Sequence, residues 1–241
     1  MIQYLTTITS CLLFCAHAFA AAAEDGKHLF ILSGQSNMTG LNPAISFTPT
    51  IETTLGKEHV IVVKDAESGQ PISRWYKAWK PVAGTPPPTT TGDLYDRLMV
   101  KVKAAIEGKE IKTVTFVWMQ GERDAKTGQS AVYEASLKGL LEQLRTDLKR
   151  NDIYFVIGRL SDCLLDNAEW MALRKAQVAF AESDPRGAWV DTDDLNDKPG
   201  KNGVQINDLH YSAKGYATLG QRFADKALVL INGKPSSLPK P

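Results

Sequence analysis

The sequence predicts an α/β protein of three layers, with helices on both faces of a doubly wound, mainly parallel sheet of five strands. Short apolar runs recur along the chain, and segments with the apolar spacing of helices separate them. The runs are rich in β-branched residues and poor in polar ones, which is typical of strands covered on both faces. This alternation indicates right-handed crossovers between parallel strands. A chain of 241 residues fits one large α/β domain.

Five apolar runs are the candidates for the strands. In chain order they are HLFIL at 28–32, HVIVV at 59–63, VTFVWM at 114–119, IYFVIGRL at 153–160 and AWV at 188–190. In sheets of this class, ligands bind beyond the carboxyl ends of the strands. Residues that follow each run are therefore the first candidates for a functional site.

Helical spacing is clearest in four segments. Segments 94–106 and 170–180 are predicted helices, and 132–148 is a third, because five of its leucines fall on one face: Leu137, Leu140, Leu141, Leu144 and Leu148. A last helix follows Ser212, a residue suited to an N-cap, and its apolar positions are Tyr216, Leu219, Phe223 and Ala227. The segment GTPPPTTTG at 84–92 is predicted to be a surface loop.

The two ends of the chain differ from the rest. Residues 1–23 carry no Lys, Arg, Asp or Glu, and their apolar stretch leads into Ala18-Phe19-Ala20, which resembles a signal-peptidase site. We expect a signal peptide, a folded domain over 24–232 and a disordered tail over 233–241, which contains three prolines. The protein would then be exported, periplasmic or extracellular, with no membrane span after processing. A disordered or membrane-anchoring N-terminus is the alternative.

Composition excludes several classes of function. A net charge of +1 gives no reason to expect nucleic acid or an anionic membrane as a partner. Cys163 would stand alone after processing, so we expect a small buried hydrophobe and no disulfide. Metal and dinucleotide motifs are missing, and the acidic run 191–197 lacks the pattern of a calcium loop. We expect no metal and no cofactor; the oligomeric state stays open.

Two short motifs indicate chemistry. Ser36 lies in GQSNM, directly after the first predicted strand, and His210 lies in NDLHYS. A serine hydroxyl becomes a useful nucleophile only beside a base that takes its proton, and histidine has the pKa for that task. GQSNM lacks the second glycine of G-x-S-x-G, so the α/β-hydrolase elbow does not apply.

Four blocks in order resemble the SGNH/GDSL hydrolase superfamily, more specifically its sialate O-acetylesterase-like and acetylxylan-esterase group, carbohydrate esterase family 6. The blocks are ILSGQSNMTG (31–40), AESGQPISRWYKAWK (66–80), FVWMQGERDA (116–125) and NDLHYSAKGY (207–216). They spread over nearly the whole of the predicted domain. The resemblance implies a flavodoxin-like, three-layer fold and a serine esterase that acts on acetylated carbohydrates.

The resemblance also implies a role for one residue or more in each block. Ser36 would attack an ester carbonyl, and its backbone N–H would help to bind the oxyanion. Gly69 would add a second backbone N–H, since glycine lets the backbone approach a substrate closely. Gln120 would add its side-chain amide to the same oxyanion hole. His210 would be general base and then general acid, and Asp208 would orient it.

One block departs from the superfamily pattern. The acid usually lies three residues before the histidine, but here that residue is Asn207, and Asp208 lies two before His210. Residues two apart often point in different directions, so Asp208 could miss the imidazole. Asn207 or a backbone carbonyl could fix the ring instead.

Further residues of these blocks are expected to brace the site or to contact substrate: Gln35, Asn37, Arg74, Glu122 and Asn207. Glu122 would brace the oxyanion loop, with Arg123 or Arg74 as its partner, or it is simply a surface acid. Three aromatic residues either form a wall for a sugar ring or belong to the core: Trp75, Tyr76 and Trp79.

The sequence thus predicts an exported carbohydrate O-acetylesterase that forms an acyl-enzyme on Ser36. A lipase or thioesterase of the same superfamily is one alternative. A catalytically silent carbohydrate-binding relative is another. Which acetylated glycan is the substrate does not follow from the sequence, because the discriminating loops are its least predictable segments.

Overall fold

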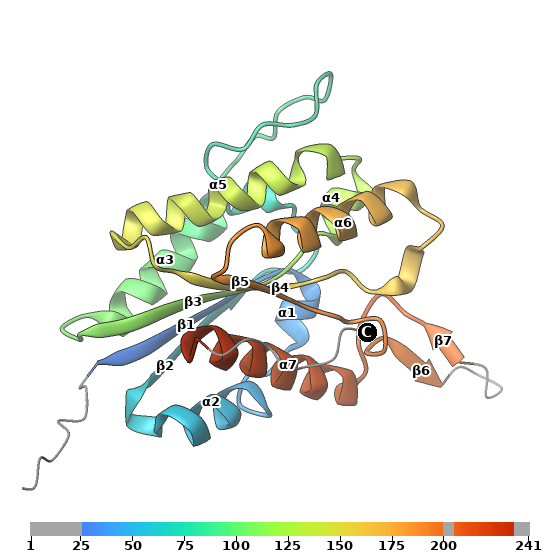
Figure 1. The fold of residues 1–241 in the computed structure, drawn as a ribbon. Coiled ribbons are helices and arrows are strands. Elements are labelled where there is room, and N and C mark those ends of the chain that lie inside the picture. Colours follow the sequence, from blue (N-terminus) through green and yellow to red (C-terminus); the bar gives the residue numbers. More distant parts are fainter. Residues whose placement is uncertain (1–25, 200–204, 234–241) are drawn as a thin grey trace, which may run out of the picture.

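The computed structural model describes residues 26–199 and 205–233, and its centre is a five-stranded parallel sheet (Figure 1). The strands lie in the order β2-β1-β3-β4-β5. Their bounds are β1 Lys27–Gly34, β2 Val60–Ala66, β3 Ile111–Met119, β4 Tyr154–Gly158 and β5 Gly187–Val190. All five predicted strands are present, and the predicted three-layer α/β class is confirmed.

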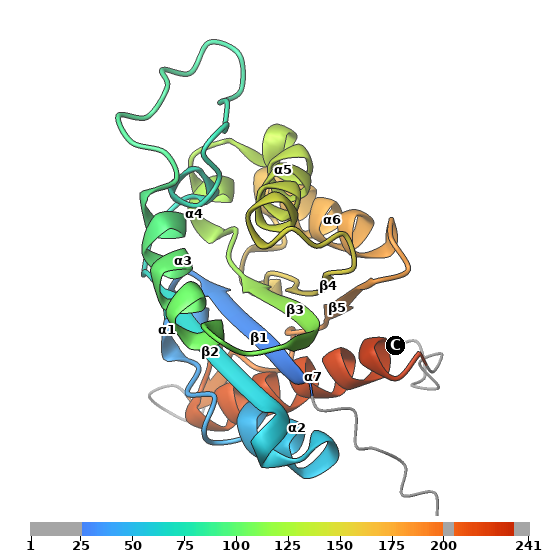
Figure 2. The same cartoon turned by 90° about the vertical axis from the view of Figure 1, so that its left-hand side faces the viewer.

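Helices cover both faces of this sheet (Figures 1 and 2). One face carries α3 (Asp93–Ile106), α5 (Ser130–Leu148) and α6 (Ala168–Glu182). The other carries α2 (Phe47–Leu55) and α7 (Ala213–Ile231). The four predicted helices correspond to α3, α5, α6 and α7. The predicted N-cap of α7 is also confirmed, since the Ser212 hydroxyl accepts a hydrogen bond from the Gly215 N–H at 3.0 Å.

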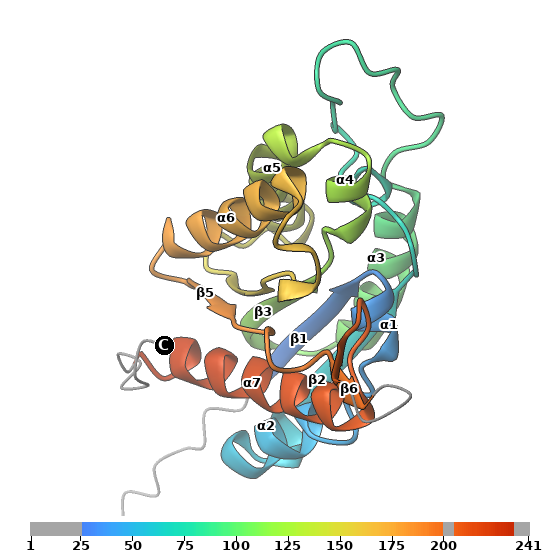
Figure 3. The ribbon, with the colours of Figure 1, turned by 90° about the vertical axis from the view of Figure 1, so that its right-hand side faces the viewer.

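Several shorter elements were not predicted. They are α1 (Ser36–Gly40), α4 (Glu122–Lys126), the 3₁₀ turns η1 (Lys57–His59), η2 (Ile72–Arg74) and η3 (Asp162–Leu164), and an antiparallel hairpin of β6 (Asp197–Pro199) and β7 (Gln205–Asn207). The hairpin lies beside the beginning of α7 (Figure 3). The predicted loop at 84–92 has no regular structure and extends away from the helical layer (Figure 2).

The register of the strands places their carboxyl ends side by side. Gly34 at the end of β1 pairs with Ala66 of β2 and with Met119 of β3. Gly158 of β4 pairs with Val190 of β5. The loops that follow β1, β2 and β3 therefore leave the sheet together, and these loops carry three of the four motif blocks.

The predicted signal peptide at 1–23 and residues 234–241 of the predicted tail lie outside the described residues. Within the described part of the chain, no helix is both long and apolar enough to cross a membrane.

Candidate active site

A cavity of about 570 Å³ opens at the carboxyl edge of the sheet, and both Ser36 and His210 line it. The other lining residues come from every motif block and from the segment after β4: Gln35, Ser68, Gly69, Glu122, Arg123, Lys126, Cys163, Leu164, Trp170 and Leu209. The fold thus brings into one cavity two motif residues from opposite ends of the domain.

Ser36 owes its place to the turn that ends β1. Gly34 has φ +144°, and a Cβ at this position would lie 1.9 Å from the Met119 carbonyl oxygen, so only glycine fits. The Gln35 N–H then donates to that same carbonyl at 2.9 Å. Ser36 follows as the first residue of α1, half-buried, with its hydroxyl at the cavity.

The neighbours of Ser36 tie the nucleophile turn to the rest of the site. Asn37 is buried, and its Nδ2 donates to Glu122 Oε1 at 2.9 Å and to the Leu209 carbonyl at 3.1 Å. Its Oδ1 accepts from the Tyr216 hydroxyl at 3.1 Å. Asn37 therefore fixes α1 against both α4 and the loop that carries His210.

The loop after β2 carries Gly69 to the cavity in a left-handed conformation, with φ +70°. Its carbonyl accepts from Arg123 Nε at 2.7 Å. Arg74 does not line the cavity. It donates to Gln70 Oε1 at 2.7 Å and pairs with Asp93 at the start of α3, so it anchors the Gly69 loop from behind.

Gln120 lies deeper than the sequence suggested. Its side chain is fully buried and is absent from the cavity lining, because its Nε2 lies within hydrogen-bond distance of Gln70 O at 3.0 Å and Asp124 Oδ2 at 2.6 Å. A third acceptor, Gln35 Oε1, lies at 3.2 Å, and Tyr133 donates to the Gln120 Oε1. In this arrangement the Gln120 side chain joins the loops after β1, β2 and β3, and its place in the oxyanion hole stays a prediction.

Glu122 is the buried acid of the cavity. Its Oε1 accepts from Asn37, whereas Oε2 has no hydrogen-bond partner among the described residues. Burial is the largest influence on this carboxyl and raises its pKa to about 7. A carboxyl that titrates near neutrality beside a serine and a histidine is suited to proton chemistry. Neither arginine expected as its partner forms an ion pair with it; Asn37 takes that place.

Asp124 supports the same loops from inside the protein. Its Oδ2 accepts from the Ile72 N–H at 2.9 Å and from Gln120, and the side chain is fully buried. Burial raises the pKa of Asp124 to about 6. Through Ile72 it holds the end of the segment that carries Gly69.

His210 is exposed at the cavity, and Asp208 contacts it through the backbone: Asp208 Oδ1 accepts from the His210 N–H at 3.3 Å. No hydrogen bond between the Asp208 carboxylate and the imidazole, or between Ser36 and the imidazole, occurs in the described part of the chain. Asn207 belongs to β7, but its side chain lies outside the described residues.

Sequence reasoning missed a group of residues on the cavity wall. Cys163 and Leu164, in η3 after β4, form an apolar side with Leu209, and Cys163 is half-buried here and not fully buried as expected. Burial raises the pKa of its thiol. Arg123 and Lys126 of α4 are exposed and form a cationic side. The rule that ligands bind after the strand ends, applied to the fourth run, could have found η3.

The aromatic residues near Arg74 belong to the core. Trp75 is buried and packs edge-on against Trp118, with ring centroids 5.2 Å apart. Tyr76 and Trp79 are partly buried against the same core, and none of the three lines the cavity. These positions favour the interpretation that the three residues belong to the core.

A second cavity of about 620 Å³ lies between α5 and α6, over Phe155 and Phe180. Charged side chains, among them Arg145 and Asp184, surround these rings, and its lining contains no histidine. The nucleophile and the base of the motif blocks both lie in the first cavity. Among the residues that the structure describes, no cluster of histidine, cysteine and acidic side chains is arranged to hold a metal ion.

Comparison with known families gives one match over most of the chain. A profile of the family described as carbohydrate esterase, sialic acid-specific acetylesterase, matches residues 39–229, beginning three residues after Ser36. No curated protein sequence matches this chain significantly.

Solved structures with the same fold include an Arabidopsis thaliana protein, with a TM-score of 0.63 and 19% identity over 84% of this chain and 98% of that protein. NanS aligns with a TM-score of 0.61 and 15% identity over 87% of this chain and 99% of its own. A carbohydrate acetylesterase from Xanthomonas citri aligns with a TM-score of 0.62 and 15% identity over 87% of this chain but 57% of its own. At these identities the likeness concerns the fold alone.

Proposed function

Because this chain belongs to the sialic acid-specific acetylesterase family of carbohydrate esterases, we propose that it removes O-acetyl groups from carbohydrates through an acyl-enzyme. The observation that carries the proposal is the single cavity lined by both Ser36 and His210. Nucleophilic catalysis by a serine and a histidine needs no cofactor.

In the proposed reaction His210 takes the proton of the Ser36 hydroxyl as its Oγ attacks the acetyl carbonyl carbon. The oxyanion of the tetrahedral intermediate faces the backbone N–H groups of Ser36 and Gly69, each contributing on the order of 3 kcal/mol. His210 then gives the proton to the sugar oxygen as the C–O bond breaks, which leaves an acetyl group on Ser36. A water molecule, deprotonated by His210, attacks this ester and releases acetate.

Two carboxylates are candidates for orienting the imidazole. Asp208 is the residue that the motif suggests, and its Oδ1 contacts the His210 backbone. Glu122 lines the same cavity and has one oxygen without a hydrogen-bond partner among the described residues. An imidazole N–H donor would satisfy that oxygen.

Replacement of the nucleophile tests the proposal. Ser36→Ala should abolish hydrolysis of p-nitrophenyl acetate and of acetylated sugars, and it should leave the far-ultraviolet circular dichroism spectrum unchanged. Labelling by a fluorophosphonate should be lost in the same variant. A Ser36→Ala protein that hydrolyses acetate esters at the wild-type rate would overturn the proposal.

Matched amide variants distinguish the two carboxylates. The residue that orients His210 should lose on the order of 10⁴-fold in kcat when it is converted to its amide, whereas the other should lose less than about tenfold. Asp208→Asn and Glu122→Gln are therefore compared at equal folded concentration. A small loss in both would mean that Asn207 or a backbone carbonyl orients the ring.

The cavity walls bear on the substrate. Arg123 and Lys126 place positive charge in the cavity that Ser36 also lines, which favours an acetylated sugar that carries a carboxylate, such as the sialic acid for which the family is named. Faster turnover of long-chain esters than of acetate would instead favour a lipase or thioesterase. Glycan binding without fluorophosphonate labelling would favour the silent relative.

Export is part of the proposal and follows from the sequence pattern of residues 1–23. Amino-terminal sequencing of the protein recovered from its natural compartment tests it. A mature protein that retains these residues would contradict a cleaved signal peptide.

A further inference from the structure

The loop that carries His210 is attached to the loop that follows β5. The Ser212 N–H donates to the Leu195 carbonyl at 3.2 Å, and the Asp208 N–H donates to the Asn196 carbonyl at 3.2 Å. The contact is close, because a Cβ on Gly215 in the first turn of α7 would lie 2.1 Å from the Leu195 carbonyl oxygen. The position of His210 therefore depends on the position of residues 191–196.

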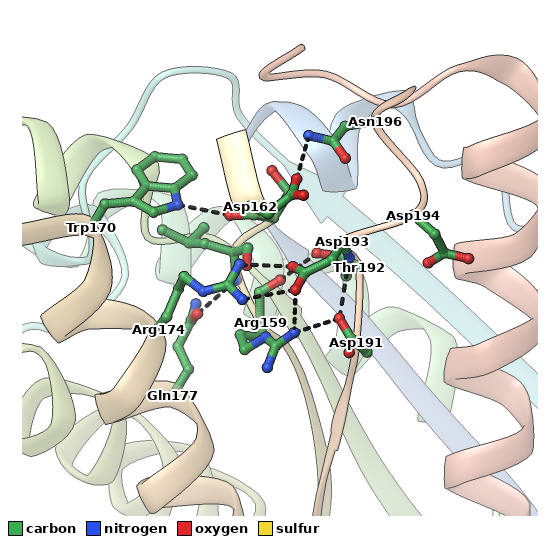
Figure 4. Close-up of polar contacts among 12 residues, drawn as sticks. Arg159, Asp162, Trp170, Arg174, Gln177, Asp191, Thr192, Asp193, Asp194 and Asn196 are labelled. Carbon is green, nitrogen blue, oxygen red and sulfur yellow. Dashed lines mark hydrogen bonds and ion pairs between the residues drawn. The ribbon is translucent and has the colours of Figure 1, made fainter. Parts of the chain in front are cut away.

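Residues 191–196 are held in turn by arginines from neighbouring elements (Figure 4). Arg174 of α6 donates to both carboxylate oxygens of Asp193, at 2.7 and 2.9 Å, and to the Leu160 carbonyl at 2.6 Å. Arg159, after β4, donates to Asp191 at 2.5 Å and to Asp193 at 2.7 Å. Paired hydrogen bonds between arginine and carboxylate fix direction as well as distance.

The third arginine comes from α7 itself. Arg222 donates to both carboxylate oxygens of Asp194, at 2.6 and 2.7 Å, and to the Asp191 carbonyl at 2.9 Å. Carboxylates of the acidic run at 191–197 thus bind arginines and hold this loop against the neighbouring segments. Three of its carboxylates, those of Asp191, Asp193 and Asp194, form ion pairs with arginines from α6, from α7 and from the segment after β4.

Asn196 is where this loop meets the histidine loop. Its side chain is fully buried, and its Nδ2 lies 2.9 Å from the Asp208 carbonyl. The same Nδ2 lies 3.2 Å from Asp162 Oδ1 (Figure 4). Asn196 therefore holds Asp208 twice, through the backbone N–H and through the carbonyl. Asn37, from the nucleophile's helix, holds the next carbonyl, that of Leu209.

We propose that Asn196 is a positioning residue for His210, and this inference rests on the esterase function proposed above. Its side-chain amide holds the Asp208 carbonyl, two residues before His210, and its backbone carbonyl accepts from the Asp208 N–H. Loss of its amide would let the histidine loop move relative to Ser36. A displacement of about 1 Å in a catalytic group can cost on the order of a hundredfold in rate.

The test compares Asn196→Ala with Gln143→Ala. Gln143 is a matched control, because its side-chain amide also hydrogen-bonds to the backbone of a loop, donating to the Trp75 carbonyl at 3.0 Å and accepting from the Lys77 N–H at 3.0 Å. Residues 75–77 do not line the cavity. Asn196→Ala should lower kcat for p-nitrophenyl acetate by about 10–100-fold with little change in KM, whereas the control should keep the wild-type kcat.

A readout that does not depend on catalysis accompanies the kinetics. Amide hydrogen exchange in the 205–212 segment should become at least about tenfold faster in Asn196→Ala and stay unchanged in Gln143→Ala. If wild-type kcat and exchange persist in Asn196→Ala, the inference is wrong. An inactive wild type would overturn the proposed function alone, because exchange would still decide whether Asn196 holds the loop.

A second variant covers the case in which alanine prevents folding. Asn196→Asp keeps the shape of the side chain but places an oxygen near the Asp208 carbonyl and Asp162. Relative to wild type, its activity should recover as the pH falls and the new carboxyl is protonated. A constant ratio between variant and wild type across the pH range would contradict the positioning role.

Discussion

At the scale of single residues, two buried carboxyl groups on α4 both hold the site together and have raised pKa values. Glu122 and Asp124 lie two positions apart, one at the cavity and one beneath the Gly69 loop. Burial raises the pKa of Glu122 to about 7 and that of Asp124 to about 6. Both groups therefore change charge within the range in which a histidine-dependent esterase works.

The raised pKa of Glu122 makes stability depend on pH. Folding favours the protonated form of Glu122. The stability that this carboxyl contributes to the folded protein is therefore complete below about pH 4 and is lost as the pH rises through about 7. Glu122→Gln has no carboxyl at this position and does not lose this stability. The free energy of unfolding of the variant minus that of the wild type should therefore rise by about 3 kcal/mol from about pH 4 to pH 8. Urea unfolding at several pH values measures it.

The control for this experiment is Glu142→Gln, since the Glu142 side chain is 55% exposed and pairs with Arg145 at the surface. Its stability difference from wild type should stay nearly constant over the same range. A constant difference for Glu122→Gln as well would show that folding does not raise the pKa of Glu122.

The cationic side of the cavity predicts substrate preference. Lys126→Gln should raise KM by about three- to tenfold for an acetylated sugar that bears a carboxylate, and should leave KM for its neutral methyl ester unchanged. The effect should shrink at high salt, because exposed charges are screened. Lys138→Gln, which removes a lysine at the second cavity, is the control. Equal KM changes for both substrates would exclude recognition of the carboxylate.

At the scale of elements, the turn after β1 determines where the nucleophile lies. Gly34→Ala would force a Cβ to within 1.9 Å of the Met119 carbonyl oxygen and keep a positive φ. We expect a loss of about 3 kcal/mol or more, measured as a lower thermal midpoint. Gly108→Ala is the control, because it has φ +67° and no neighbour within 4 Å, and it should cost about 1 kcal/mol. Equal losses of stability in the two variants would mean that the close contact between Gly34 and the Met119 carbonyl is unimportant.

The strands and long helices were predictable because their signal is local. Their apolar residues follow the period of the element, and burial of those residues is what holds the element in place. Helix α2 was missed because Pro49 interrupts its sequence, yet proline is tolerated in the first turn, where its missing N–H leaves no hydrogen bond unmade. The β6–β7 hairpin has strands of three residues each, too short for a periodic pattern.

Polar partners were far less predictable than strands. The sequence placed Ser36, Gly69 and His210 near one sheet edge, and the structure brings all three to one cavity. The burial of Gln120 depends on the distances between three loops, which no spacing in the chain encodes. The acids at 191–194 likewise form ion pairs with arginines 19 to 34 positions away in the chain. Which arginine pairs with which acid therefore depends on the tertiary fold.

At the scale of the whole molecule, the order of the strands explains how residues from opposite ends of the domain meet. Ser36 follows β1, which lies second in the order of strands across the sheet. His210 comes after the edge strand β5 and before α7. Contacts across this span join them: Asn37 to the Leu209 carbonyl, and Tyr216 of α7 to Asn37. The ring of Tyr216 also lies so close to Gly40 that a Cβ there would approach it to 2.4 Å.

This interlocking predicts that the site is lost only when the domain unfolds. Activity and far-ultraviolet circular dichroism should therefore decline at the same urea concentration in the wild type. Tyr216→Phe removes one buried hydrogen bond of about 1 kcal/mol, so both midpoints should fall together by about 0.5 M for a slope near 2 kcal/mol/M. An activity midpoint below the structural one, in either protein, would mean that α7 and the histidine loop open as a separate unit.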